Sequence, residues 1–145
     1  MATPGWDGEL ALAASDAESP SWAVRAAAGR RLAAAAEAPG TAQVLHRLLL
    51  DDYDTAVIQE TAQALLQRRD VQGLRVVLKA LSEAKEDDVA DQLVLEIDCD
   101  DRWLSDEPGG DELIQQLRAL TLDTDEGVRE EAEALLSRQS ERRWM

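Results

Sequence analysis

The sequence has no phenylalanine, one tyrosine and few β-branched residues, so it holds little of the material that favours β-strands. Its apolar content lies instead in 24 alanines and 21 leucines, which are good helix formers. The single cysteine, Cys99, has no partner for an intrachain disulfide. A chain of 145 residues with 45% hydrophobic content can bury a core without a metal or a disulfide. We expect one all-α domain over residues 1–145.

Basic residues are also scarce, with 15 lysines and arginines against 30 acids and a net charge of -15. This balance repels phosphate backbones and anionic lipid surfaces, so we expect no nucleic-acid partner and no membrane partner. No apolar run approaches the ~18 residues that a spanning helix would need. The first residues lack the basic segment and apolar stretch of a secretory signal. We therefore expect a cytoplasmic protein.

An internal repeat organises the chain. Residues 58–66 read IQETAQALL and residues 128–136 read VREEAEALL, and both have a β-branched anchor followed by the same two alanines and the same leucine pair. Weaker copies begin at Val24 and Val89. An apolar helical segment precedes each copy. Polar stretches rich in helix-capping residues separate that segment from the copy that follows it. The pattern predicts four helical hairpins, with helices over 8–16, 20–37, 41–50, 55–69, 71–83, 87–98, 111–122 and 125–140.

The segment from Leu120 to Arg129 reads LTLDTDEGVR and is followed by Ala132 and the pair Leu135 and Leu136. It resembles a repeat of the HEAT-like, armadillo-type family of α-helical repeat proteins. The resemblance implies a short right-handed α-solenoid of about four HEAT-like hairpins. It also implies that Asp123 and Arg129 help to join neighbouring repeats. Arg25 matches the arginine of this motif, but Gln59 and Ala90 stand at that position in the middle repeats.

An acidic insertion lengthens the last interval of the repeat. It covers residues 98–110, and the stretch from Glu83 to Glu112 carries 13 acids against Lys85 and Arg102, a local net charge of -11. Such a concentrated field speeds encounter with a basic partner, although a solvated loop that keeps the protein soluble would look the same. The loop departs from the spacing of a calcium-binding loop, and only a nonstandard weak cation site stays open.

We expect the partner-binding residues to be acids of this loop and acids two and five positions after the repeat anchors, together with one tryptophan. Trp103 could anchor an interface or pack beneath its own loop. Trp22 is expected to be a core or helix-staple residue. The predicted partner-binding set is Glu60, Asp91, Asp98, Asp100, Asp101, Trp103, Asp106, Glu107, Glu130 and Glu133.

No residues form a recognisable active site. Cys99 has acidic neighbours that disfavour a reactive thiolate, and His46 lies in an apolar helix with no partner visible in the sequence. One histidine and one cysteine cannot supply the usual zinc ligands. We therefore expect no enzyme activity, no cofactor and no metal.

The leading hypothesis is a non-enzymatic module whose acidic surface holds a basic protein. Its narrower form is an immunity- or antitoxin-type inhibitor that covers a cationic toxin domain. A regulatory scaffold or adaptor would instead bind a peptide or helix through arginines of the N-terminal half, which are Arg25, Arg30, Arg31 and Arg47. A lyase-like enzyme would need a reactive Cys99. The sequence leaves the partner and the oligomeric state open.

Overall fold

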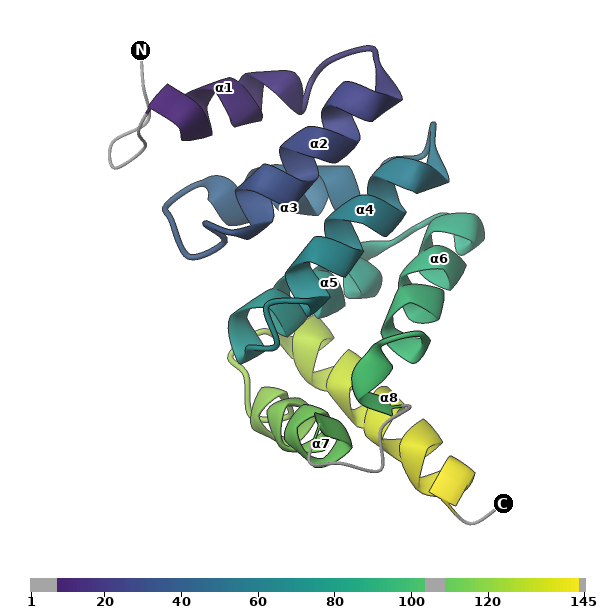
Figure 1. The fold of residues 1–145 in the computed structure, drawn as a ribbon. Coiled ribbons are helices and arrows are strands. Elements are labelled where there is room, and N and C mark those ends of the chain that lie inside the picture. The colour runs from purple at the N-terminus through teal and green to yellow at the C-terminus, as the bar shows by residue number, and fades with distance from the viewer. Residues whose placement is uncertain (1–7, 104–108, 144–145) are drawn as a thin grey trace.

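The computed structural model describes residues 8–103 and 109–143, and this part of the chain is all-helical (Figure 1). The order of elements follows the predicted hairpins closely. The helices are α1 (Gly8–Asp16), α2 (Trp22–Ala33), α3 (Thr41–Leu49), α4 (Thr55–Leu66), α5 (Val71–Glu83), α6 (Asp87–Asp98), the short 3-10 helix η1 (Asp101–Trp103), α7 (Gly109–Leu120) and α8 (Glu126–Arg143).

Side-chain caps fix where several helices begin. Asp54 Oδ1 accepts a hydrogen bond from Ala56 N at 2.9 Å, and Asp125 Oδ1 accepts one from Val128 N at 3.0 Å. These bonds satisfy backbone amides that have no partner within the first helical turn. The helix predicted from residue 20 begins instead at Trp22, because Ser21 provides the cap.

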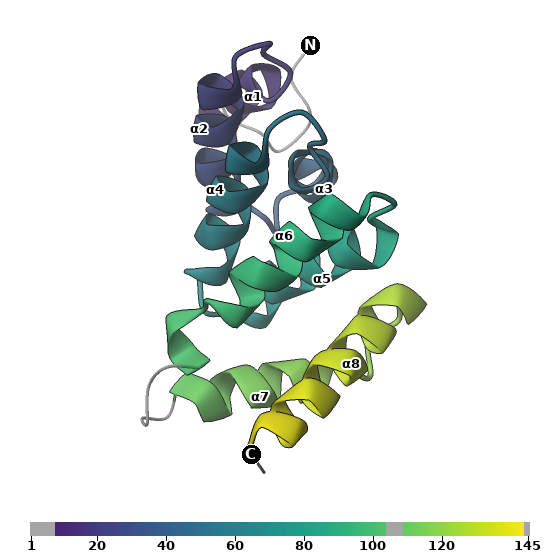
Figure 2. The same cartoon turned by 90° about the vertical axis from the view of Figure 1, so that its right-hand side faces the viewer.

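The even-numbered helices α2, α4 and α6 lie side by side, and α3 and α5 form a second layer behind them (Figures 1 and 2). The core between the layers consists of alanine, valine, leucine and isoleucine. Three repeat anchors, Ile58, Val89 and Val128, are buried in it as the spacing predicts. The fourth, Val24, is on the contrary exposed.

The last hairpin, which consists of α7 and α8, does not continue the row of α2, α4 and α6. Helix α8 packs against α5 and α7, whereas α6 is not among its main neighbours. In Figure 2, α7 and α8 cross beneath the other helices. The outer side of α6 is consequently left without a neighbouring helix of the row, and its Leu95 is 51% exposed.

The structure describes both ends of the acidic insertion. Residues 101–103 form η1, and α7 begins at Gly109, two residues earlier than predicted. Asp106 and Glu107 lie outside the described residues, so their predicted contact with a partner is not placed by the structure.

Candidate functional site

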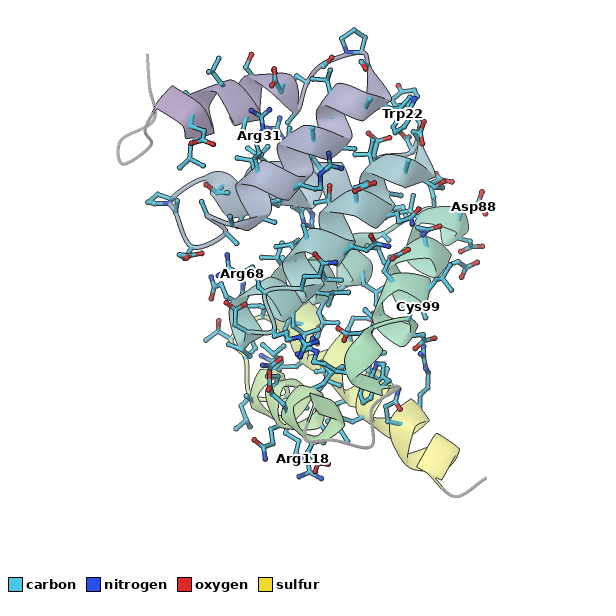
Figure 3. The ribbon with its side chains drawn as sticks, viewed as in Figure 1. Trp22, Arg31, Arg68, Asp88, Cys99 and Arg118 are labelled. Atoms are coloured by element: carbon cyan, nitrogen blue, oxygen red, sulfur yellow. The ribbon has the colours of Figure 1, made fainter. Side chains whose placement is uncertain are left out.

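Exposed acids gather at the start of α6. Glu86, Asp87, Asp88 and Asp91 are all exposed, and within the described residues none of them forms an ion pair or a side-chain hydrogen bond. We call these four residues the α6 acidic face. Figure 3 shows Asp88 on the outer side of the molecule. Acids in the first turn of a helix also suit the positive end of the helix dipole, which stabilises them there.

A second group of acids lies on α8. Glu126, Glu130 and Glu133 are exposed, on the side of the helix opposite the buried Val128, Ala132 and Leu135. We call these three glutamates the α8 acidic face. Because α8 packs under α5 rather than beside α6, the two acidic faces belong to different layers of the molecule. The exposed acids that follow the repeat anchors of α6 and α8 therefore lie on two separate faces.

Three acids of the predicted binding set are engaged within the protein, and two of them, Asp98 and Asp100, belong to the acidic insertion. Asp100 is buried, and its carboxylate accepts hydrogen bonds from Arg102 Nε at 3.0 Å and Arg102 Nη2 at 2.8 Å. Asp98 forms an ion pair with Arg138 of α8. The prediction that these carboxylates meet a partner finds no support in their positions, because both are already neutralised. They are likewise poor candidates for the weak cation site.

The buried Arg102 organises the start of the insertion. Besides Asp100, it donates to Gln116 Oε1 at 3.0 Å, and Gln116 donates in turn to the carbonyl of Arg69 at 2.8 Å. This network links η1 and α7 to the turn between α4 and α5. Asp101 belongs to η1, but its side chain lies outside the described residues.

Trp103 is half-buried and packs against the core, with its indole Nε1 donating to the carbonyl of Ile97 at 3.0 Å. Of the two alternatives for Trp103, this position agrees with packing inside the protein and not with an exposed interface anchor. Trp22, which was expected to be a core or staple residue, is instead 51% exposed. Tyr53 is 91% exposed, and nothing in the sequence pattern singled it out.

Among the other predicted residues, Asp91, Glu130 and Glu133 are exposed on the two acidic faces. Glu60 is half-buried on α4 and pairs with Arg30 of α2 at 2.7 Å. Asp87 and Asp88 belong to the acidic stretch from Glu83 to Glu112, but they are not in the predicted partner-binding set. Their exposure and lack of a partner distinguish them, and neither property is visible in a local sequence pattern.

The arginines of the N-terminal half are paired with acids. Arg25 contacts Asp51 at 2.9 Å, and Arg30, Arg31 and Arg47 contact Glu60, Asp16 and Glu18. They therefore do not form the open cationic surface that the adaptor hypothesis needs.

An ion-pair network ties α5 to the turn before α8. Arg75 contacts Asp123 at 2.9 Å, and Lys79 contacts both Asp125 at 2.5 Å and Glu83 at 2.9 Å. Hydrogen bonds from Arg75 and Lys79 lower the pKa values of Asp123 and Asp125 below their ordinary range. Asp123 thus joins neighbouring hairpins, as the resemblance implied. Its partner is nevertheless Arg75, while Arg129 donates to the carbonyl of Asp123 at 2.8 Å.

Cys99 is exposed beside a hollow of about 510 Å³ that includes Glu96 and Asp100. Glu96 accepts hydrogen bonds from Gln63 at 3.1 Å and Gln92 at 2.7 Å, so both acids already have partners. The described residues contain no group of three or more His, Cys, Asp or Glu that could hold a metal ion. No described helix is long and apolar enough to cross a membrane.

In comparisons with known proteins, no family model, no curated protein and no solved structure matches this chain.

Proposed function

We propose that this chain is a non-enzymatic, cytoplasmic protein-binding module that holds a basic surface of a protein partner. In this proposal the helical hairpins form a short right-handed α-solenoid, and its acidic C-terminal half carries the binding surface. The observation that supports it most directly is an imbalance in charge pairing. Most described arginines and lysines lie in ion pairs, whereas the α6 acidic face has none.

This imbalance matters because a neutralised charge contributes little to the field around the protein. The carboxylates of Asp87, Asp88 and Asp91 project into water, where their potential extends over roughly 8 Å at physiological ionic strength. Such a field accelerates the approach of a basic protein and disfavours acidic ones. It predicts complexes that weaken as salt increases.

The narrower proposal is an immunity- or antitoxin-type inhibitor that covers the cationic substrate site of a toxin domain. The small size, the net charge of -15 and the absence of a recognisable active-site motif in the sequence favour this version. Blocking a basic site requires only a complementary acidic surface of sufficient area and needs no chemistry from the inhibitor.

Affinity capture from the native organism tests the general proposal. The tagged full-length chain serves as bait at low and moderate salt, captured proteins are identified by mass spectrometry, and a purified partner is then titrated. We expect a basic protein whose dissociation constant rises at least about tenfold between 50 and 200 mM salt, as screening of several charge pairs requires.

Two matched variants locate the binding surface. Asp88→Asn with Asp91→Asn removes two charges from the α6 acidic face, and Glu130→Gln with Glu133→Gln removes two from the α8 acidic face. We expect about tenfold weaker binding for the first pair and less than a twofold change for the second. The reverse result would move the surface to α8. A partner whose binding responds to neither pair and not to salt would refute the proposal.

A further inference from the structure

The protein places its few described aromatic residues unusually. Among the residues that the structure describes, no aromatic side chain is fully buried, and of the three aromatic residues there only Trp103 packs against the core. Trp22 and Tyr53 are exposed instead, by 51% and 91%. Exposing large aromatic surface to water is unfavourable, and tryptophan and tyrosine are the residue types most enriched at the energetic centres of interfaces.

Trp22 and Tyr53 lie in the same region of the fold. Trp22 begins α2, and Arg25 lies one turn further on the same side of that helix. Arg25 Nε donates to Asp51 Oδ2 at 2.9 Å, and Asp51 Oδ1 accepts from the backbone amide of Tyr53 at 3.0 Å. These bonds hold the turn that carries Tyr53 against the start of α2.

A hollow of about 470 Å³ lies in this region, lined by Pro20, Tyr53 and Arg25 together with Glu18, Ser19 and Asp51. Arg25 is neutralised there, because it contacts Asp51 and donates to the carbonyl of Ser19 at 2.9 Å. The opening therefore combines a proline and a tyrosine ring, and its two acids, Glu18 and Asp51, are paired with Arg47 and Arg25.

The starts of α2, α4 and α6 follow one another along one side of the molecule (Figure 1), and Figure 3 shows Trp22 and Asp88 on that side. We call this side, with Trp22, Asp52, Tyr53, Asp87 and Asp88, the turn edge. Helix starts carry partial positive charge, but the cap of Asp54 on α4 and the acids of the first turn of α6 offset it. The exposed Tyr53 follows the exposed Asp52 in the chain, and Trp22 lies on the same side of the molecule as Asp88 (Figure 3).

We propose that the turn edge is the docking surface for an arginine-bearing segment of the basic partner. A guanidinium group is planar, always charged and weakly hydrated, so it stacks on aromatic rings and pairs with carboxylates at the same time. Trp22 and Tyr53 supply the rings, and Asp52, Asp87 and Asp88 supply complementary charge. This inference rests on the proposed function and adds the chemical class of the contact.

A nonaarginine peptide with a fluorescent label is the probe, and its binding to the full-length chain is followed by fluorescence anisotropy in 150 mM salt. We expect Trp22→Ala and Tyr53→Ala each to weaken binding about fivefold, as the loss of one cation–π contact implies. Leu12→Ala, which removes another exposed apolar side chain on α1 and outside the turn edge, serves as the control and should change binding less than twofold. Circular dichroism checks that each variant keeps its helical content.

A nonalysine peptide of equal charge sharpens the test. We expect it to bind the unaltered chain more weakly than nonaarginine and to lose less affinity in the two aromatic variants, because ammonium groups stack less well. The inference is overturned if the unaltered chain does not bind nonaarginine, or if the double variant of Trp22 and Tyr53 binds it within twofold. If Asp88→Asn with Asp91→Asn still weakens the binding of a captured basic partner in that case, the proposed function stands and only the turn edge is excluded as the docking surface.

Discussion

The contact between α2 and α4 differs from the contact between α5 and the last hairpin in how exposed its ion pairs are. The side chains of Arg30 and Glu60, which pair between α2 and α4, are 51% and 40% exposed, whereas Asp123 and Asp125 in the second contact are 14% and 24% exposed. In the first, Gly29 lies so near α4 that a Cβ atom there would be 2.0 Å from Thr61 Oγ1. In the second, Gly127 approaches Ser82 of α5 similarly, but Arg75 and Lys79 add two less exposed ion pairs with the turn before α8. Close packing thus dominates at the contact between α2 and α4, which we call the packed end. Charge assists at the contact between α5 and the last hairpin, which we call the charged end.

Because of this difference, the two regions should respond differently to salt and pH. Van der Waals packing depends little on salt or pH. Partly exposed ion pairs, in contrast, weaken as the salt concentration rises and as acid protonates their carboxylates. The row of α2, α4 and α6 should therefore keep its arrangement under conditions that loosen α7 and α8.

The largest expected effect comes from Arg102. Replacing it with methionine leaves the carboxylate of Asp100 buried without its cation, and we expect a loss of about 4 kcal/mol in the free energy of unfolding. Urea denaturation measures this loss. The double variant Arg102→Met with Asp100→Asn should recover more than half of it, because no buried charge is then left unpaired. Equal destabilisation in the single and double variants would refute this explanation.

Gly29→Ala tests the packed end of the comparison. The added methyl group would overlap Thr61 Oγ1, so we expect a loss of about 2 kcal/mol, measured by the same denaturation. Thr61→Ala removes the overlapping oxygen and should reduce the penalty in the double variant. Gly8→Ala is the matched control, since no atom lies within 4 Å of its Cβ position. A loss in the control as large as that for Gly29 would exclude crowding against Thr61 as the cause, since alanine has the higher helix propensity and should not itself destabilise a helix.

Acid should weaken the charged end first. The pKa values of Asp123 and Asp125 are lowered from 3.8 in the folded state, chiefly by Arg75 and Lys79. Their contribution to stability is complete above pH 3.8 and is lost as the pH falls through the lowered pKa values. Amide hydrogen exchange read by mass spectrometry should show α7 and α8 losing protection before α2 and α4 in this range. Asp123→Asn should reduce that pH dependence, and simultaneous loss of protection in all helices would contradict it.

The sequence was a good guide to the helices because local signals determine them. Caps such as Asp54 and Asp125 mark helix starts, and the repeat identifies equivalent positions such as Ile58 and Val128 that prove buried. The position of the last hairpin has no such signal. It depends on pairs like Arg75 with Asp123, which are 48 residues apart and follow no helical or strand period.

The candidate site was less predictable for the same reason. Acidic composition indicated the region, but Asp100 and Asp91 look alike in sequence and differ completely in the fold. One is neutralised by a buried arginine two residues away, and the other faces water. The exposure of Tyr53 likewise reflects which helices happen to adjoin its turn, and a lone tyrosine in a polar stretch carries no pattern that reveals this.

The smallest expected effect concerns Glu131, a half-buried acid on α8 with no ion pair among the described residues. Burial and then the neighbouring charge of Glu130 raise its pKa above 4.5, so the folded protein holds its proton more tightly than the unfolded chain. The charged form therefore costs stability at neutral pH, and this cost disappears as the pH falls below the raised pKa. We expect Glu131→Gln to stabilise the protein at pH 7 by about 0.5 kcal/mol and to have no such effect near pH 4. Thermal unfolding at both pH values measures the difference, with the exposed Glu133→Gln as the control. Destabilisation by Glu131→Gln at pH 7 would instead mean that this carboxylate makes a favourable contact, and the last hairpin would then depend on charge even more than its ion pairs indicate.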